Sequence, residues 1–255
     1  MKQDSNQIRT TIAKLDGTSH LAAVATPVAE EIHVWEFRSD MPESRPEDIA
    51  SLLSADERQR AARFHFERDR HRFSVTRART RMILGAYLQS DPRDLRFKYS
   101  AREKPSLEGA SADIRFNVSH SGGQSIVAVA TGREIGADIE QIRRNFECEQ
   151  LAERFYSAGE RAFMRQVPED QKLRVFFRLW TCKEAFLKAH GTGLSRPLSS
   201  FDVRLGERPW QLLRISGDAG EEERWSLVEI ESASGYPAAA AVEGSLGAMR
   251  VYRWE

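Results

Sequence analysis

Cysteine is scarce in this chain of 255 residues, which holds only Cys148 and Cys182, at a spacing that matches no metal-binding motif. A disulfide-stapled secreted domain is therefore disfavoured, and a reduced cytoplasmic protein is expected. Long apolar runs are also missing, because no stretch approaches the ~18 residues that a membrane span needs. Residues 1–30 lack the apolar core of a signal peptide, and we expect this extension to be poorly ordered.

Net charge is absent as well, because 38 basic residues balance 38 acidic ones. This balance argues against nucleic-acid and membrane partners. The local exception is the stretch from Ser54 to Arg81, where nine arginines face four acids. A helix over Arg58–Arg81 could dock on nucleic acid or on an acidic protein, which keeps a non-enzymatic binding module as an alternative.

Common catalytic signatures are missing too. No glycine run precedes a Lys-Ser or Lys-Thr pair, so the chain has no P-loop. No nucleophile elbow occurs, and Ser119 and His120 are adjacent, which disfavours a hydrogen-bonded pair of nucleophile and base. A serine hydrolase is therefore poorly supported.

A scheme of strands and helices occurs twice along the chain. Apolar patterning predicts strands, while Ser54-Ala-Asp-Glu57 and Ser157-Ala-Gly-Glu160 predict capping boxes that open helices. The expected strands cover residues 31–37, 95–99, 125–130, 134–139, 201–205, 225–231, 238–242 and 249–252, and residues 116–121 lead through the turn at Gly122-Gly123 into the strand 125–130. Further helices are expected over residues 79–89 and 149–155 and from about residue 172 onward. We therefore predict an α+β fold of two similar α/β subdomains, residues 31–132 and 133–255.

Acidic residues suggest a metal site. Asp138 and Glu140 lie two positions apart on an expected strand, so their side chains project from the same face. Adjacent carboxylates repel each other unless a cation or a proton lies between them. An open all-oxygen site of this kind suits Mg²⁺, which keeps waters and bridges substrate phosphates. Without a third ligand an exposed strand edge would explain the pair better, and Glu184 is the candidate third ligand.

Basic residues near these acids could contact phosphate. Lys183 and Lys188 lie on the same expected helix as Glu184, although a Glu–Lys pair four residues apart is more often a solvated salt bridge. His120 lies in a Ser-His-Ser-Gly-Gly turn, where backbone amides and hydroxyls can surround an anion. A histidine that satisfies backbone groups of the turn explains this position equally well.

Three further residues have simple structural explanations beside functional ones. Lys104 could contact phosphate but is more often an ordinary surface lysine. Arg72 could clamp a phosphate through two hydrogen bonds, although most arginines of its helix must form a solvated face. Glu160 is explained first as the reciprocal member of its capping box, with catalysis as a secondary role.

Four motifs taken together resemble the Sfp-type 4′-phosphopantetheinyl transferases. They are Lys104-Pro105, Phe116-Asn-Val-Ser-His-Ser121, Gly136-Ala-Asp-Ile-Glu140 and Trp180-Thr-Cys-Lys-Glu-Ala-Phe-Leu-Lys188, in the family's order and at similar spacings. The resemblance implies two α/β subdomains in a pseudo-twofold arrangement, with coenzyme A in the cleft between them. It implies a Mg²⁺-dependent transfer of phosphopantetheine from coenzyme A to a serine of an apo acyl or peptidyl carrier protein, as in holo-[acyl-carrier-protein] synthase. Adenosine 3′,5′-bisphosphate is released.

The resemblance also implies roles for single residues. Asp138, Glu140 and Glu184 match the metal-binding carboxylates. Lys188 matches a lysine near the reacting phosphate, and Glu160 matches an acidic residue near the catalytic centre. The residues that match contacts to coenzyme A are Lys104, Ser119, His120, Lys183 and Lys188. Arg72 is expected to contact the nucleotide too, with Arg70 as the alternative.

Several points stay open at this stage. The base that deprotonates the carrier serine could be Glu184, Glu160 or a metal-bound water, while Lys188 would offset phosphate charge and protonate the leaving group. Another Mg²⁺-dependent phosphotransferase or nucleotide hydrolase is the enzymatic alternative. Carriers of fatty-acid, polyketide and nonribosomal-peptide synthesis are all possible. A monomer is expected, because an internally duplicated chain needs no second copy to form its cleft.

Overall fold

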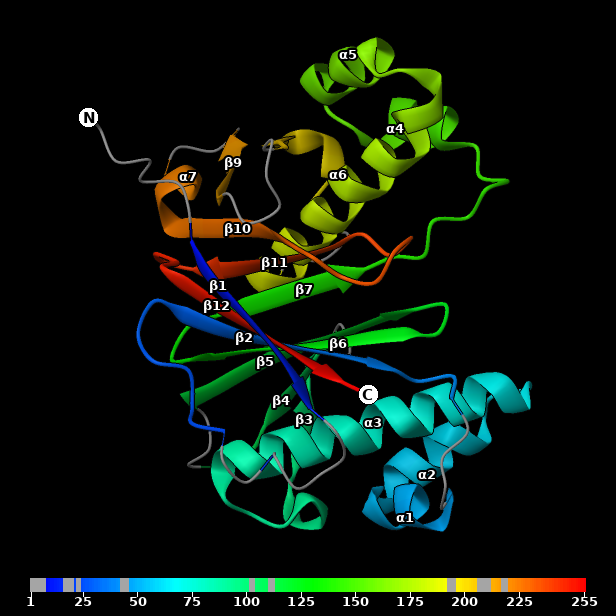
Figure 1. The fold of residues 1–255 in the computed structure, drawn as a ribbon, viewed down its shortest axis with the longest axis vertical. Coiled ribbons are helices and arrows are strands. Elements are labelled where there is room, and N and C mark those ends of the chain that lie inside the picture. The colour runs from blue at the N-terminus through cyan, green and yellow to red at the C-terminus, as the bar shows by residue number, and fades with distance from the viewer. Residues whose placement is uncertain are drawn as a thin grey trace.

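The computed structural model describes residues 8–15, 21, 24–41, 46–100, 104–109, 113–191, 196–205, 212–216 and 220–255, without the side chains of residues 46, 212–216, 221 and 222. Figure 1 shows their arrangement. The elements follow one another as β1 (Arg9–Leu15), β2 (Glu31–Arg38), α1 (Pro46–Leu52), α2 (Ala55–Ala62), α3 (Glu67–Leu88), η2 (Pro92–Asp94), β3 (Phe97–Tyr99), β4 (Pro105–Leu107), β5 (Ile114–Ser121), β6 (Gln124–Thr131), β7 (Ile135–Ile139), α4 (Cys148–Phe155), α5 (Ala158–Gln166), α6 (Glu169–His190), η5 (Leu198–Ser200), β8 (Asp202–Arg204), β9 (Leu212–Ser216), α7 (Glu221–Arg224), β10 (Trp225–Ile230), β11 (Ala238–Glu243) and β12 (Ala248–Trp254).

The strands form two five-stranded sheets and a small ribbon. The first sheet has the order β1-β12-β2-β6-β5, the second has the order β7-β11-β10-β9-β8, and β3 pairs with β4. The pairings β1–β12 and β12–β2 are parallel, and the others are antiparallel. The predicted α+β class is confirmed.

The two sheets face each other between two helical layers (Figure 1). Helix α3 covers the outer side of the first sheet and α6 covers the outer side of the second. Three apolar clusters fill the three interfaces: one between α3 and the first sheet, one between the sheets, and one between α6 and the second sheet. The molecule is therefore a four-layer stack in which the sheets meet in the middle.

Strand β6 shows how the sequence builds these layers. Successive side chains of a strand point to opposite faces. Ile126, Ala128 and Ala130 pack toward the second sheet, whereas Val127 and Val129 pack toward α3. Because both faces are apolar, this strand is buried along its length, and the short loop 132–134 then carries the chain from the first sheet into β7 of the second.

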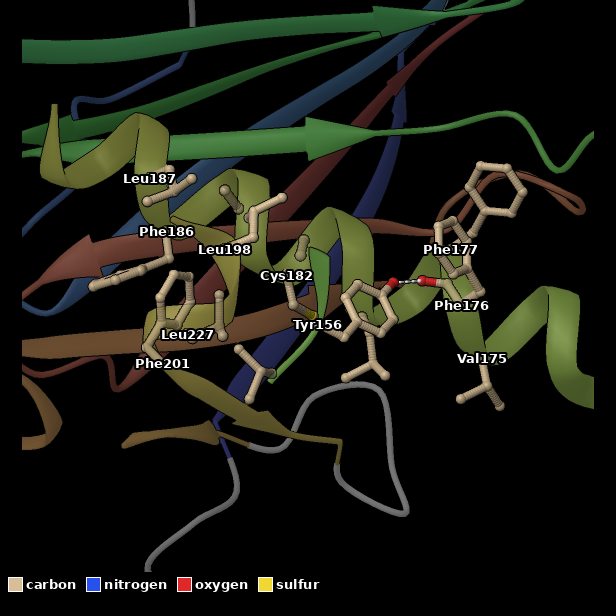
Figure 2. Packing of buried hydrophobic residues seen from close by; sticks show 14 of the residues in the cluster. Tyr156, Val175, Phe176, Phe177, Cys182, Phe186, Leu187, Leu198, Phe201 and Leu227 are labelled. Atoms are coloured by element: carbon tan, nitrogen blue, oxygen red, sulfur yellow. Dashed lines mark hydrogen bonds between the residues drawn. The ribbon is translucent and has the colours of Figure 1, made fainter. Parts of the chain in front are cut away.

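Helix α6 is anchored by the aromatic residues of its buried face. Phe176, Phe177 and Phe186 are each almost fully buried, and the Tyr156 hydroxyl donates a hydrogen bond of 2.6 Å to the Phe176 carbonyl oxygen (Figure 2). Gly191 ends the helix in the left-handed conformation, with a φ of 77°. The helix begins at Glu169, three residues before the predicted start.

Both ends of the chain contribute to the first sheet. Within residues 1–30, for which the sequence predicted a poorly ordered extension, Arg9–Leu15 forms the edge strand β1 and pairs with β12. Strand β12 comes from the predicted C-terminal subdomain, yet it pairs with β2. Hydrophobic alternation identifies a strand without naming its partner, so the sequence did not reveal this return. The subdomain boundary near Gly132 stays a prediction.

The predicted basic helix Arg58–Arg81 is two helices, α2 and α3, and its arginines do not form one exposed face. Arg81 is 1% exposed and its Nε donates to Glu57 Oε2 at 2.7 Å. Arg77 also lies close to this carboxylate, with 3.3 Å between its Nε and Glu57 Oε1. These inward cations stabilise the α2–α3 packing, which weakens the alternative of a nucleic-acid docking helix.

Candidate active site

The candidate site lies where edge strands of the two sheets run side by side. Strands β5 and β7 are in contact, and side chains of β5 accept hydrogen bonds from backbone N–H groups of the loop-and-strand segment that starts at β7. The Ala137 amide donates to Asn117 Oδ1 at 2.9 Å, and the Gln141 amide donates to Ser121 Oγ at 3.1 Å. Ser119 Oγ accepts a longer bond of 3.4 Å from the Ile139 amide. Three polar side chains of β5 therefore join the two sheets, and each accepts from the amide 20 residues later in the chain.

Ser119 and Ser121 also bind the acidic residues at the end of β7 and directly after it. Ser119 Oγ donates to Asp138 Oδ1 at 2.8 Å, and Ser121 Oγ donates to Glu140 Oε2 at 2.6 Å. From α6, Lys188 Nζ donates to Asp138 Oδ1 at 2.6 Å and to Ser119 Oγ at 3.2 Å. Lys188 is thus not simply a partner of Glu184 along its own helix, since it reaches across to the neighbouring strand.

The three predicted metal ligands share one electrostatic environment. The pKa of Glu184 is raised by burial and by the negative charges of Asp138 and Glu140. The pKa of Glu140 is raised by burial and by Asp138, against the opposing effects of Ser121, Arg143 and Lys188. The three carboxylates therefore lie near enough for their charges to interact, and their mutual repulsion favours a bound cation.

The donor set fits Mg²⁺ in its chemistry. Asp138 is 4% exposed, and its Oδ2 atom has no hydrogen-bond partner, so a buried carboxylate oxygen is left for a cation. As they stand, no three His, Cys, Asp or Glu side chains in the described ranges are arranged closely enough to hold a metal ion. Binding would require the carboxylates to draw closer together, and a cation between them would offset their repulsion.

A group of positive charges borders the carboxylates. His120 lies at the end of β5. Partial desolvation of its ring and the positive charges of Lys188 and Arg72 lower its pKa. Arg72 Nε is buried without a hydrogen-bond partner. The positive charges of Lys188 and Arg72 beside His120 form an environment in which an anion is favoured.

Arg70 and Arg72 occupy different sides of α3, because two helical positions differ by about 200° of rotation. Arg70 Nη1 lies 3.0 Å from Glu67 Oε2 at the start of the helix. Arg72, in contrast, lies near His120. Of the two arginines that the sequence left open, the structure brings Arg72 to the candidate site.

Lys183 is placed away from solvent, where it cannot serve as the predicted contact to coenzyme A. Its side chain is 0% exposed, and Nζ donates to both carboxylate oxygens of Glu160, at 2.6 and 2.8 Å, and to the Phe201 carbonyl at 2.6 Å. The three donors of a lysine are then all used. Helical periodicity places Lys183 on a different side of α6 from Lys188, which the motif alone does not show.

Glu160 is occupied in the same way. It completes the predicted capping box with Ser157, binds Lys183, and accepts a hydrogen bond of 2.8 Å from the Val203 amide. At 3% exposed it lies in the core. The structure therefore supports the capping role and not the secondary role near the catalytic centre.

Lys104 joins elements around the site. Its Nζ donates to the Lys188 carbonyl at 2.9 Å and to the Ile135 carbonyl at 3.1 Å, and it lies 3.3 Å from Glu134 Oε2. A cation near the last carbonyls of a helix is favourable. Burial lowers the pKa of Lys104. This lysine ties the C-terminal end of α6 to β7, and its predicted phosphate contact would require these bonds to break.

Sequence reasoning missed Asn117, Ser121 and Arg143. The signal for Asn117 and Ser121 is present in Phe116-Asn-Val-Ser-His-Ser121, where every second residue is polar. On an edge strand this alternation marks a face that meets polar partners. Arg143 lies just beyond Glu140 and its charge lowers the pKa of that carboxyl against the effect of burial.

Two family models match neighbouring parts of the chain. A model described as "4′-phosphopantetheinyl transferase, N-terminal" matches residues 42–132, and one described as "4′-phosphopantetheinyl transferase superfamily" matches residues 134–241. A solved structure of a holo-(acyl-carrier-protein) synthase from Bacillus anthracis in complex with CoA (3′,5′-ADP) shares 23% identity and has a TM-score of 0.37, covering 44% of this chain and 96% of that chain. No helix of the described ranges is long and apolar enough to cross a membrane.

Two relatives match over most of their length. The 4′-phosphopantetheinyl transferase HetI of Nostoc sp. is 39% identical over 221 residues, which are 86% of this chain and 90% of the relative. The 4′-phosphopantetheinyl transferase Sfp of Bacillus subtilis is 33% identical over 175 residues, which are 68% of this chain and 76% of the relative. Together with the two family models, these identities show that the chain belongs to the 4′-phosphopantetheinyl transferase family.

Proposed function

We propose that this enzyme transfers 4′-phosphopantetheine from coenzyme A to a serine of an apo carrier protein, with Mg²⁺ required and adenosine 3′,5′-bisphosphate released. Membership of the family supports the transfer. The site assignment rests on one observation: Asp138, Glu140 and Glu184 lie near enough for their negative charges to interact, and Lys188 is bonded to Asp138. Such a site attracts a divalent cation and places the ammonium group of Lys188 beside it.

Asp138, Glu140 and Glu184 are the residues that would hold Mg²⁺. The ion would supply charge neutralisation for the pyrophosphate of coenzyme A. Lys188 would exchange its bond to Asp138 for one to the reacting phosphate and offset the charge that grows there. His120 and Arg72 would bind further phosphate oxygens, since Arg72 Nε is buried without a hydrogen-bond partner and its charge acts on His120.

Glu184 is our candidate for the base that takes the proton of the carrier serine. Burial and Asp138 raise its pKa, and a carboxylate has two oxygens, so one could accept the proton while the other faces the cation. Glu160, the other side chain considered, is buried with Lys183 and has no free access to a substrate. Lys188 would then be the donor that protonates the departing bisphosphate.

The finer assignments belong to the same proposal. We propose the holo-[acyl-carrier-protein] synthase reaction, in the cytoplasm, by a monomer with residues 31–132 and 133–255 as subdomains. Carriers of fatty-acid, polyketide and nonribosomal-peptide synthesis are the substrate classes to compare.

A panel of apo carrier proteins tests this function. Each carrier is incubated with the enzyme, coenzyme A and Mg²⁺, and its intact mass is measured. We expect the mass of one phosphopantetheine group to be added to at least one carrier, and we expect this addition to stop when the Mg²⁺ is chelated. Unmodified carriers throughout the panel would contradict the proposed function, and transfer that persists after chelation would contradict the metal requirement.

A further inference from the structure

Ser121 lies at the end of β5 and makes two hydrogen bonds that together connect the sheets to the acidic site. Its hydroxyl accepts from the Gln141 amide at 3.1 Å and donates to Glu140 Oε2 at 2.6 Å. The hydroxyl proton is thereby directed at the carboxylate. The backbone bond fixes the oxygen, and the side-chain bond fixes the glutamate.

Ser119, two residues earlier on β5, makes the same pair of hydrogen bonds. Ser119 accepts from the Ile139 amide and donates to Asp138 Oδ1. Each serine therefore binds one acidic residue and the amide of the residue that follows it. This repetition, at Asp138 on β7 and at Glu140 directly after it, indicates that the serines orient the carboxylates and do not merely cover a strand edge.

Glu140 needs such a partner more than Asp138 does. A glutamate side chain has one more rotatable bond than an aspartate, so more conformational entropy is lost when it is held in one orientation. Asp138 is also bound by Lys188 Nζ. The hydrogen bond from Ser121 is the short contact that holds Glu140 in the described structure.

We propose that Ser121 is a positioning residue that holds Glu140 in the orientation from which this carboxylate binds the divalent cation. The inference rests on the proposed Mg²⁺-dependent function. Hydrogen-bond partners of metal-binding carboxylates typically change metal affinity or activity by about 10- to 100-fold when they are removed.

A purely structural role would be to tie β5 to the second sheet. Asn117 provides the comparison, because its Oδ1 accepts from the Ala137 amide at 2.9 Å and no bond from Asn117 to a carboxylate is part of the described structure. Asn117→Ala removes a tie between the sheets without removing a partner of Glu140. Ser121→Ala removes both functions, and Ser121→Thr keeps the hydroxyl.

The test measures Mn²⁺ binding in the presence of coenzyme A by calorimetry or electron paramagnetic resonance, together with thermal melting, for the wild type and these three variants. We expect Ser121→Ala to bind Mn²⁺ about 10- to 100-fold more weakly, and Ser121→Thr to bind it nearly as the wild type does. Asn117→Ala should melt at a lower temperature but keep its Mn²⁺ affinity. The KM for Mg²⁺ in carrier modification should rise in Ser121→Ala alone.

Two outcomes would overturn the inference, and only the second would also overturn the proposed metal site. If Ser121→Ala binds Mn²⁺ as tightly as the wild type, Ser121 is only a tie between the sheets, and the proposed function stands. If the wild type binds no Mn²⁺ with coenzyme A and modifies carriers without a divalent cation, the metal site and this inference both fail.

Discussion

At the scale of single residues, the charges around β5 decide which groups can meet an anion. Arg72 lies near His120, whereas Arg70 is paired with Glu67. A charge-assisted hydrogen bond contributes about 1.5–3 kcal/mol, which corresponds to roughly a 10- to 100-fold change in affinity. We therefore expect Arg72→Ala to weaken coenzyme A binding by at least about tenfold, as measured by calorimetry.

Arg70→Ala is the matched control for that change, because it removes the same side chain from the same helix two positions away. It should leave the affinity for coenzyme A nearly unchanged. Equal losses in the two variants, or a loss in Arg70→Ala alone, would show that the structure orients these arginines incorrectly.

His33 is a buried titratable group far from the acidic site. Trp35 Nε1 donates to the Tyr87 hydroxyl at 2.8 Å, so that hydroxyl can donate its own proton to His33 Nδ1, 2.7 Å away. Nε2 then carries the proton of the neutral ring and lies 3.5 Å from Glu31 Oε2. Burial lowers the pKa of His33 to about 4, against the opposing effect of Glu31.

This lowered pKa predicts a loss of stability in acid. The folded state holds His33 neutral, whereas the unfolded chain takes up a proton below about pH 6.5. The stabilisation is therefore complete above pH 6.5 and is lost as the pH falls toward 4, by up to about 3 kcal/mol. Urea unfolding at a series of pH values should show this loss in the wild type. The free energy of unfolding of His33→Asn should depend much less on pH over the same range. Parallel pH profiles of the two proteins would contradict the buried neutral histidine.

At the scale of elements, Gly136 lets β7 and α6 approach each other. A Cβ atom at this position would lie 2.2 Å from both the Ala185 carbonyl oxygen and the Ala189 amide nitrogen. These are backbone atoms, so the helix itself would have to move. Because α6 carries Glu184 and Lys188, its position also sets the distance between these groups and β7.

Gly136→Ala is expected to lower the free energy of unfolding by about 1–3 kcal/mol, as overpacked substitutions do, and to reduce transfer activity in the fraction that remains folded. Gly247→Ala serves as the control, since its nearest contact would be an ordinary 3.5 Å to Glu30. Chemical denaturation and a carrier-modification assay measure the two effects. A Gly136→Ala enzyme with unchanged stability and activity would refute the close approach.

The pair of Lys183 and Glu160 joins α5, α6 and β8 from inside. Removing one partner of a buried ion pair leaves the other charge uncompensated and destabilises a protein by about 3–5 kcal/mol. We expect Lys183→Met to show a loss of this size in denaturant unfolding, and Lys183→Met with Glu160→Gln to recover part of it. The folded double variant should bind coenzyme A with wild-type affinity. A stable Lys183→Met protein that has lost coenzyme A binding would instead restore the contact predicted from the motif.

At the scale of the whole molecule, the candidate site lies at the seam between two sheets. Asp138 lies on the edge strand β7 of one sheet and Glu140 directly follows it, and their serine partners lie on the edge strand β5 of the other. Glu184 and Lys188 come from α6, a helix on an outer face. The apolar cluster between the sheets fixes their separation. The geometry of the site therefore depends on how the two halves of the chain pack.

The sequence predicted much of this arrangement where the cause is local. Capping boxes at Ser54 and Ser157 and most strands follow from nearby residues and are present in the structure. The two-residue spacing of Asp138 and Glu140 predicted both acids on one strand, whereas β7 ends at Ile139, one residue before Glu140. The negative charges of both acids act on Glu184.

What the sequence did not predict depends on partners far along the chain. The depth of Lys183 and Glu160 follows from the packing of α5, α6 and β8 and not from the motif around them. Strand β12 pairs with β2, and β1 pairs with β12. The hydrophobic pattern of a strand does not specify which strand it pairs with. The link between Ser121 and Glu140 requires knowing that two edge strands of different sheets run side by side.

The most direct measurement of the central claim is the intact mass of a responsive apo carrier after incubation with coenzyme A, Mg²⁺ and either wild-type enzyme or Asp138→Asn. Asp91→Asn, a substitution at the half-buried N-cap of η2, is the control. We expect the phosphopantetheine mass to be added by the wild type and by the control, and to be absent or reduced by several orders of magnitude with a correctly folded Asp138→Asn enzyme. Equal rates of transfer by all three proteins would show that the carboxylates gathered at the β5–β7 seam are not the site of the reaction.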